Sequence, residues 1–250
     1  MSDLIFHHYP QSPVAEKVRV GMGLKKLSWH SVEIPRIPPK PDLMPLTGGY
    51  RRTPVMQFGA DIFCDSQSIL RELERRYPEP TFFSERSGGL EWGISRWTDT
   101  DLFIAMIKLI LSVSADSIPA EFVKDRTRLY LGENADLREV AKNIPHLVSQ
   151  IRAQLGWIEQ RLAEELDFIS GDKPGLPDAQ FYYLIWFLRG RWDGGPGLLS
   201  EFPALEAWEA RIQEIGHGTS TELSSTEALV IAKASTTEFS LDIDVRDPLA

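Results

Sequence analysis

The chain is predicted to join a mixed α/β part to a helical part. Residues 1–85 contain short runs rich in aromatic and β-branched side chains that alternate with amphipathic helical segments. From about residue 90 to residue 235, every periodic segment has the three- and four-residue spacing of a helix. The 250 residues, of which 42% are hydrophobic, are enough to bury one large core or two modest ones. We therefore predict an α/β domain over residues 1–85 and an all-α domain over residues 90–235.

The first predicted strand, at residues 4–9, leads directly into a helix. Ser12 is placed to cap that helix, because its side-chain oxygen can accept from the free N–H groups of the first turn. Pro13 suits the first helical position, where the missing N–H would make no hydrogen bond. An apolar stripe runs through Val14, Val18 and Met22, so we expect the charged residues of this helix to stay in water. These are Glu16, Lys17, Arg19, Lys25 and Lys26.

A second strand is predicted at residues 29–34, and prolines at positions 35, 38, 39, 41 and 45 then impose an irregular loop. Loops of this length in a compact domain are often functional. Two short strands at residues 55–58 and 61–64 flank Gly59-Ala60 as a hairpin, and a helix capped by Asp65 or Ser66 follows. The helix between the first two strands makes them parallel, whereas the hairpin adds antiparallel strands.

In the second half, the most apolar helix is expected at residues 178–188 and should lie in the middle of the domain. Two further helices are predicted at residues 204–215 and 221–234. The tail, residues 236–250, alternates apolar and polar side chains as a strand does. A lone strand is not stable, so the tail pairs with a sheet edge or another chain, marks a truncation, or is disordered.

Composition excludes several classes of protein. With 27 basic and 36 acidic residues, the formal net charge of −9 opposes non-specific binding to nucleic acid or to anionic membranes. We find neither an export signal nor an uninterrupted apolar span, so a soluble cytoplasmic protein is expected. The single cysteine, Cys64, excludes an internal disulfide and any Cys-x-x-Cys motif, and we predict no metal site.

Three motifs in order carry a resemblance that covers most of the chain. Ser12-Pro13-Val14, followed by Lys17-Val18-Arg19, is similar to the helix start of serine-type glutathione transferases of the tau-like and omega-like classes. Arg52-Thr53-Pro54-Val55 is similar to the element whose proline is cis in that superfamily, and Asp65-Ser66 is similar to its Glu-Ser pair. The spacing, 41 positions from Ser12 to Thr53 and 12 from Thr53 to Asp65, also resembles the family's. The chain is thus identified as a member of the glutathione transferase superfamily.

The resemblance implies a thioredoxin-like N-terminal domain that binds glutathione as co-substrate, followed by an all-α domain. Ser12 would donate its hydroxyl to the glutathione thiolate, which attacks a small-molecule electrophile, and it would then point at the sulfur instead of capping its own helix. Tyr9, three positions earlier, is the alternative donor. The electrophile should lie between the domains, near Tyr9 and the helix that carries Trp97 and Asp101. A homodimer with a role in detoxification is implied as well.

The remaining site residues follow from the same resemblance. Thr53, ahead of the cis Pro54, would pair its backbone with the cysteinyl residue of glutathione. Ser66 would hold the γ-glutamyl carboxylate and Asp65 its ammonium, and Lys40 or Arg52, with Arg51 as a further candidate, would hold the glycine carboxylate. Gly175 and Asp178 resemble the family's helix-capping box with glycine in place of the usual hydroxyl. The rival hypothesis is a protein that keeps this fold and binds ligands without catalysis.

Overall fold

The computed structural model describes residues 3–84 and 88–237. Its strands are β1 (Leu4–His8), β2 (Ser28–Glu33), β3 (Val55–Phe58), β4 (Asp61–Cys64) and β5 (Thr219–Glu222). Its helices are α1 (Pro13–Leu24), α2 (Met44–Thr47), α3 (Ser66–Arg76), α4 (Gly88–Trp97), α5 (Phe103–Ser114), α6 (Ala120–Leu131), α7 (Leu137–Ala141), α8 (Ile144–Leu162), α9 (Leu176–Arg191), α10 (Gly195–Leu199), α11 (Pro203–Ile215) and α12 (Ser225–Ala234). A π-helical turn, Thr98–Leu102, joins α4 to α5.

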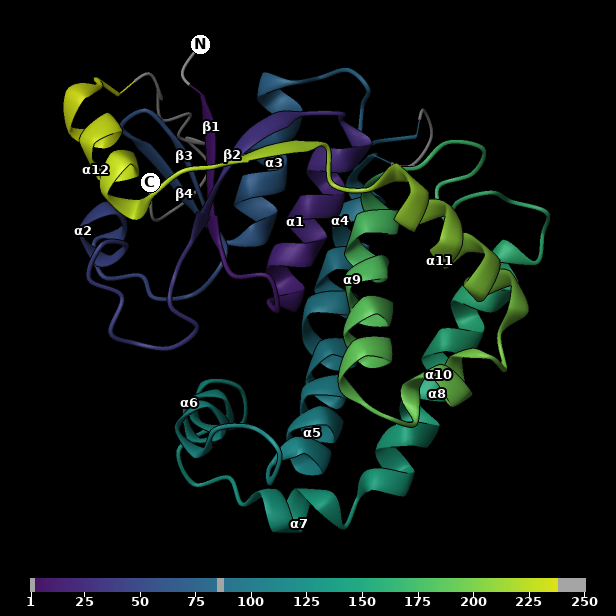
Figure 1. Ribbon diagram of the computed structural model, residues 1–250. Helices are drawn as coiled ribbons and strands as arrows, with labels where there is room; N and C mark the ends of the chain where they lie inside the picture. The colour runs from purple at the N-terminus through teal and green to yellow at the C-terminus, as the bar shows by residue number, and fades with distance from the viewer. Residues whose placement is uncertain (1–2, 85–87, 238–250) are drawn as a thin grey trace, which may run out of the picture.

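The N-terminal part is a sheet covered on both faces, as a thioredoxin-like domain requires. The strand order is β4-β3-β1-β2-β5; β1 and β2 are parallel, whereas β3 is antiparallel to both β1 and β4. The helices α1 and α3 cover one face, and α2 with α12 covers the other (Figure 1). The predicted parallel crossover and hairpin are therefore confirmed. Both faces of β1 are buried, which suits its apolar residues Leu4, Ile5 and Phe6, and the buried His7 and His8 are hydrogen-bonded to Gln57 and Ser31.

The helical part follows, with one exception to the prediction. The chain was expected to be helical from residue 221, but residues 219–222 form β5, which pairs in parallel with β2. The helix α12 begins only at Ser225, where Ser224 and Glu227 form a capping box. The strand-like tail predicted at residues 236–250 lies outside the described residues apart from its first two. No helix in the described ranges is long and apolar enough to cross a membrane.

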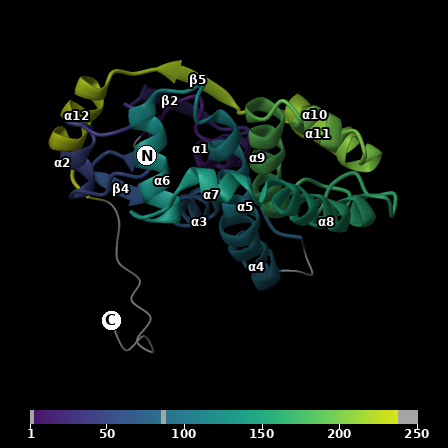
Figure 2. The same ribbon diagram turned by 90° about the horizontal axis from the view of Figure 1, so that it is seen from below.

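The helix α9 lies at the centre of the C-terminal part, as expected from its apolar sequence. It packs against α1, and a single apolar core runs from that interface through α5, α8 and α11. Figure 1 shows α9 beside α1 and shows α6 and α7 at the lower end of the molecule, and in the view from below α6 and α7 lie near the middle (Figure 2). This contact buries the charged face of α1, so the expectation that it stays in water is wrong for all but Lys26.

Each buried charge of α1 has a partner from another part of the chain. Lys17 pairs with Asp99, and Lys25 pairs with Glu74 at 2.6 Å. Glu16 accepts hydrogen bonds from Arg19, and its other oxygen lies 2.8 Å from His217 Nε2. Burial of a charge is tolerated when it is paired and hydrogen-bonded. These pairs therefore fix how α1 sits between the sheet and the helices.

The buried His8 leads to a prediction about acid stability. Arg19 Nη1 lies 2.8 Å from His8 Nδ1, and Ser31 Oγ lies 2.9 Å from Nε2. Because arginine can only donate, Nδ1 accepts and the imidazole is neutral. Burial, and next the charge of Arg19, lower the pKa of His8 to about 3. Between pH 6.5 and about 3 the unfolded chain therefore binds one more proton at this site than the folded chain does.

We accordingly expect the free energy of unfolding to fall as the pH drops below 6.5, with His8 contributing up to about 1.4 kcal/mol per pH unit. Urea unfolding of the wild type and of His8→Gln from pH 7.5 to pH 4.5 tests this. The difference between the two proteins should shrink as the pH falls. Parallel pH profiles would show that His8 does not stay neutral in the fold.

Candidate functional site

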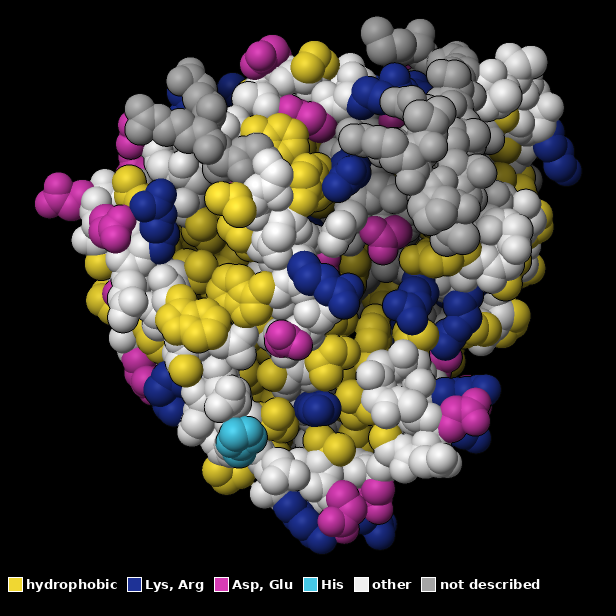
Figure 3. All heavy atoms as spheres, turned by 180° about the vertical axis from the view of Figure 1, so that it is seen from behind, with side chains coloured by type: hydrophobic (Ala, Val, Ile, Leu, Met, Phe, Trp, Pro, Cys, Tyr) yellow, Lys and Arg dark blue, Asp and Glu magenta, His cyan; other side chains and the backbone are white. Residues whose placement is uncertain are grey.

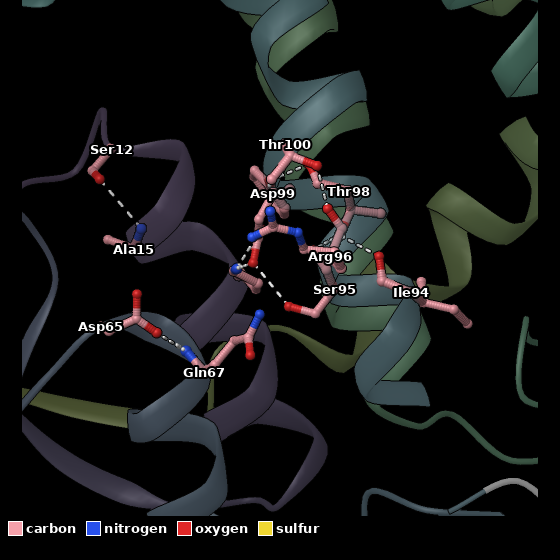
Figure 4. Close-up of polar contacts among 12 residues, drawn as sticks. Ser12, Ala15, Asp65, Gln67, Ile94, Ser95, Arg96, Thr98, Asp99 and Thr100 are labelled. Atoms are coloured by element: carbon pink, nitrogen blue, oxygen red, sulfur yellow. Dashed lines mark hydrogen bonds and ion pairs between the residues drawn. The ribbon is translucent and has the colours of Figure 1, made fainter. Parts of the chain in front are cut away.

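The hydroxyl of Ser12 stands at the start of α1, where the sequence predicts a helix cap. Its oxygen accepts from the backbone N–H of Ala15 at 3.2 Å, and the side chain is buried (Figure 4). The expectation that Ser12 points at a ligand instead of capping its helix is therefore wrong. The cap uses only one lone pair of the Ser12 oxygen. The hydroxyl proton rotates independently of this bond and remains able to donate. Capping and donation to a second group are compatible at this position.

Thr53 and Pro54 precede β3, and the peptide bond between them is cis, as the resemblance implies. Within the described residues, the backbone N–H and C=O of Thr53 form no hydrogen bond with other backbone groups. The strand ladder starts only at Val55, which pairs with His7. Thr53 thus presents a free donor and acceptor of the kind an extended peptide can pair with. Its side-chain oxygen accepts from Lys40 Nζ at 2.9 Å.

Asp65 and Ser66 form the start of α3. Asp65 is the N-cap and accepts from the backbone N–H of Gln67 at 2.8 Å, which Figure 4 shows beside the start of α1. Its φ of 74° lies in the left-handed region, which is unfavourable by about 1–3 kcal/mol for a residue other than glycine. Ser66 occupies the first helical position and is buried. Free N–H groups of a first helical turn favour a negatively charged ligand.

These elements meet at two adjoining cavities. One, of about 210 Å³, is lined by Tyr9, Ser12 and Lys40; the other, of about 310 Å³, is lined by Pro54, Asp65 and Ser66. Arg52 and Thr53 line both cavities and thus stand between them. The structure therefore brings together every residue proposed from the sequence for binding or activating glutathione, although they come from four separate segments. Their roles stay predictions.

The side chain of Lys40 is buried at the cavity beside Ser12, which Arg51 and Arg126 also line, and does not extend into solvent. It is 4% exposed, and its ammonium lies 6.0 Å from the centre of the Tyr9 ring. Burial, followed by the charges of Arg126 and Arg51, lowers the pKa of Lys40 to about 8. An anion bound beside Lys40 would reverse that shift, because it favours the protonated amine.

The helix α6 contributes two residues, Asp125 and Arg126, that no sequence pattern predicted at the site. Arg126 donates to the Tyr9 hydroxyl at 3.1 Å and to Asp125, and Asp125 in turn pairs with Arg51 at 2.9 Å. This chain of contacts ties α6 to the N-terminal part across the cavity. No spacing pointed to Arg126, because its partner Tyr9 lies 117 positions away in the chain.

Trp97 and Asp101, which were expected near the electrophile, do not line the cavity beside Ser12. Trp97 Nε1 donates to Gln154, and its ring packs on Trp157, away from the cavity. Asp101 lines a separate surface hollow between α5 and α8. The cavity beside Ser12 is lined instead by Ile107 and Ile110 of α5. Ile107 lies ten residues after Trp97 and six after Asp101, which corresponds to about 15 and about 9 Å along a helix. Within the ranges described, no group of His, Cys, Asp and Glu side chains could hold a metal ion.

Comparisons with known proteins agree with this fold. The family model "Glutathione S-transferase, N-terminal domain" matches residues 6–81, and "Glutathione S-transferase, C-terminal domain" matches residues 135–211. A solved GST-like protein from Pseudomonas syringae is 32% identical, with all of this chain and 80% of that chain covered and a TM-score of 0.76. A comparison with curated proteins gave no match.

More distant structures share the fold alone. The Tau class glutathione S-transferase MiGSTU from mango, Mangifera indica, is 15% identical over 92% of this chain and 97% of that one, with a TM-score of 0.64. Glutathione transferase GSTFuA3 from Phanerochaete chrysosporium is 18% identical over 86% of this chain and 98% of that one, with a TM-score of 0.67. Together with the two matching domains and the Pseudomonas relative, they lead to one conclusion: the chain belongs to the glutathione transferase superfamily.

Proposed function

We propose that this protein binds glutathione and activates its thiol as a thiolate that attacks a small electrophile. The observation that carries the proposal is the Ser12 hydroxyl, which caps α1 and lines a cavity adjoining the one lined by Thr53 and Ser66. A hydroxyl proton and a helix N-terminus both stabilise a negative charge at this place. Family membership supports the same function.

The energies involved are sufficient without a general base. A free thiol has a pKa of about 8.5, and lowering it by two units requires about 2.7 kcal/mol. A hydrogen bond to a charged group contributes about 1.5–3 kcal/mol, and a helix N-terminus adds about 0.3–1 kcal/mol. Ser12 at the start of α1 supplies both contributions.

The other groups fit the rest of glutathione. We assign the free backbone N–H and C=O of Thr53, next to Pro54, to the cysteinyl residue, as in the addition of a strand to a sheet edge. Ser66, at the N-terminus of α3, would hold the γ-glutamyl carboxylate, and Asp65 would face its ammonium. Lys40 and Arg52, which line the cavity beside Thr53, would hold the glycine carboxylate.

Tyr9 ranks second as thiolate donor. Tyr9 lines the same cavity, and its hydroxyl accepts a hydrogen bond from Arg126 of α6; unlike Ser12, it does not stand at the N-terminus of a helix, which would add to the stabilisation of a thiolate. We also propose, on family membership, that the protein is a cytoplasmic homodimer with a role in detoxification.

We expect bound glutathione to show thiolate absorbance at a pH about two units below that of the free thiol, and Ser12→Ala to abolish this shift. The variant should lose about 30- to 100-fold in kcat/KM, because it removes about 2–2.7 kcal/mol of stabilisation. Ser12→Thr, which keeps a hydroxyl, is the matched control and should retain most of the shift. Tyr9→Phe should change it less than Ser12→Ala does.

Stability has to be measured alongside, because Ser12→Ala also removes a helix cap worth about 1 kcal/mol. Unchanged titration of the thiol on binding to the wild type would contradict the transferase proposal. Calorimetry that detects no binding of glutathione at millimolar concentration would remove the ligand as well, and the rival hypothesis of a non-catalytic binding protein would then hold.

A further inference from the structure

The cavity of about 210 Å³ beside Ser12 is strongly basic. Six of its lining side chains are cationic: Arg36, Lys40, Arg51, Arg52, Arg126 and Arg191. None of the residues that line it is an aspartate or a glutamate. Since the whole chain carries a net charge of −9, this concentration of positive charge is a local feature and does not follow from composition. On the face that Figure 3 shows, Lys and Arg side chains lie among Asp and Glu side chains and beside hydrophobic ones.

Carboxylates neutralise only part of this charge. Asp125 pairs with Arg51 and Arg126, the two guanidinium groups nearest to it. Among the residues that the structure describes, Arg36 and Arg191 have no ion-pair partner. Aromatic rings hold them instead: Arg36 lies 4.2 Å from the ring centre of Phe122, and Arg191 lies 5.8 Å from that of Trp186.

Arg36 and Arg191 come from different parts of the chain but face the same space. Arg36 is in the loop after β2, and Arg191 ends α9. Partial burial, and next the positive charge of Arg36, lower the pKa of Arg191, so the two groups repel each other. An anion bound between two like charges removes such repulsion and is attracted by both.

Glutathione by itself does not account for these two cations. In the proposed function, Lys40 and Arg52 already serve its glycine carboxylate, and α3 serves its other carboxylate. Phe122 of α6, which also lines the cavity, contacts Arg36. The same cavity is lined by Ile107, Ile110 and Ile118, three uncharged apolar side chains.

We propose that the electrophile of this protein is an amphipathic organic acid, with its apolar body against Ile107, Ile110 and Phe122 and its anionic group between Arg36 and Arg191. The inference rests on the proposed function, because it concerns the second substrate of that site. An apolar pocket with a few well-placed charges is the usual way to fix the orientation of a small ligand. Here the charges orient the acid so that its electrophilic carbon faces the thiolate beside Ser12.

The test compares an acid with a neutral electrophile of the same shape. We suggest 4-chloro-3,5-dinitrobenzoate and 4-chloro-3,5-dinitrobenzamide. In both, the glutathione sulfur forms a bond to the ring carbon that carries chlorine, and chloride leaves with the electron pair of the broken bond. Each kcat/KM is divided by the rate constant of the uncatalysed reaction with glutathione, which removes the difference in intrinsic reactivity.

We expect this normalised value to be about tenfold higher for the acid than for the amide, since each exposed ion pair contributes a factor of about two to five. Arg36→Gln and Arg191→Gln should each lower the ratio about threefold, and the double variant should bring it close to one. Arg138→Gln, which removes an exposed arginine of α7, is the matched control and should leave the ratio unchanged. The ratio should also fall with added salt.

A binding measurement keeps the inference testable if turnover is low. Quenching of tryptophan fluorescence should show that unreactive 3,5-dinitrobenzoate binds more tightly than 3,5-dinitrobenzamide, that Arg191→Gln reduces the difference, and that the double variant removes it. Equal values for acid and amide, in turnover or in binding, would overturn the inference while leaving glutathione activation intact. Absence of glutathione binding would instead remove the proposed function, and the fluorescence comparison would still decide whether the cavity selects organic acids.

Discussion

Replacing Asp178 by alanine should lower the free energy of unfolding by about 4 kcal/mol, because buried donors left without a partner are unfavourable by about 1–3 kcal/mol each. The carboxylate is fully buried at the start of α9. One of its oxygens accepts from the backbone N–H of Ile169 and from Trp208 Nε1, at 2.8 and 2.7 Å. The other accepts from the backbone N–H of Gly175 at 2.8 Å. A domain with about 5–15 kcal/mol of stability would lose a large part of it.

The surroundings of Gly175 explain why the capping box of α9 has glycine in place of the usual hydroxyl residue. A side chain at residue 175 would bring its Cβ within 2.7 Å of the Phe82 carbonyl oxygen and within 2.5 Å of Ser170 Oγ. That Phe82 oxygen accepts from the N–H of Leu176 at 2.8 Å and so joins the N-terminal part to α9. Glycine is therefore required by the close approach, and Asp178 alone carries the cap, as the sequence led us to expect.

Chemical denaturation of Asp178→Ala is the direct measurement. Ser170→Ala is a suitable control at the same place, because it removes only a 3.3 Å hydrogen bond to Asp178 and should cost less than about 1 kcal/mol. If the alanine variant does not fold, Asp178→Asn, which keeps an acceptor for one pair of donors, should show an intermediate loss. A loss below about 1 kcal/mol in Asp178→Ala would contradict this account of α9.

Local patterns were sufficient for most of the fold. The hairpin strands Val55–Phe58 and Asp61–Cys64 have the predicted bounds, because alternation and a Gly-containing turn specify them within ten residues. The strand β5 could not be predicted in the same way. Its four residues, Thr219–Glu222, are all exposed and show no apolar alternation, and their pairing with Ser28–Glu33 joins segments that lie far apart in the chain.

The same division holds for the candidate site. Helix starts and a proline before a strand are visible in the sequence, and the order and spacing of these motifs, through the family resemblance, singled out Ser12, Thr53 and Ser66. Arg126 and Arg191 have no such signal, since each faces the cavity only through the packing of α6 and α9 against the N-terminal part. The buried charges of α1 were assigned to solvent for a related reason. A helix stripe tells which residues are apolar, but not whether a second layer covers the opposite face.

Lys17→Met should lower the free energy of unfolding by about 3 kcal/mol and weaken the binding of glutathione. The ammonium of Lys17 is fully buried and lies 2.6 and 2.8 Å from the two carboxylate oxygens of Asp99. Breaking a buried ion pair from one side typically costs about 3–5 kcal/mol, and the partial exposure of Asp99 favours the lower end. Ser95 and Tyr183 also donate to Asp99, so the carboxylate keeps two hydrogen bonds but loses its counter-charge.

The expected loss of glutathione affinity follows from the position of Asp99. It lines the cavity that contains Asp65 and Ser66, where we place the γ-glutamyl carboxylate. With Lys17 present, the pair is neutral; with methionine in its place, an uncompensated negative charge faces a negatively charged ligand. We expect affinity to fall about tenfold, which corresponds to about 1.4 kcal/mol of repulsion.

Three variants separate the effect on the fold from the effect on the ligand. Lys17→Met and Asp99→Asn should both be destabilising, but only Lys17→Met adds a negative charge to the cavity and should lose affinity in calorimetry. The double variant should lose less stability than the two single variants combined, because the second change removes the group that the first one left unpaired. Additive losses of stability, or equal affinity in all three variants, would show that Lys17 and Asp99 act independently. Coupled losses would mean that this pair holds α1 against the π-helical turn and also leaves no uncompensated charge at the cavity lined by Asp65, Ser66 and Asp99.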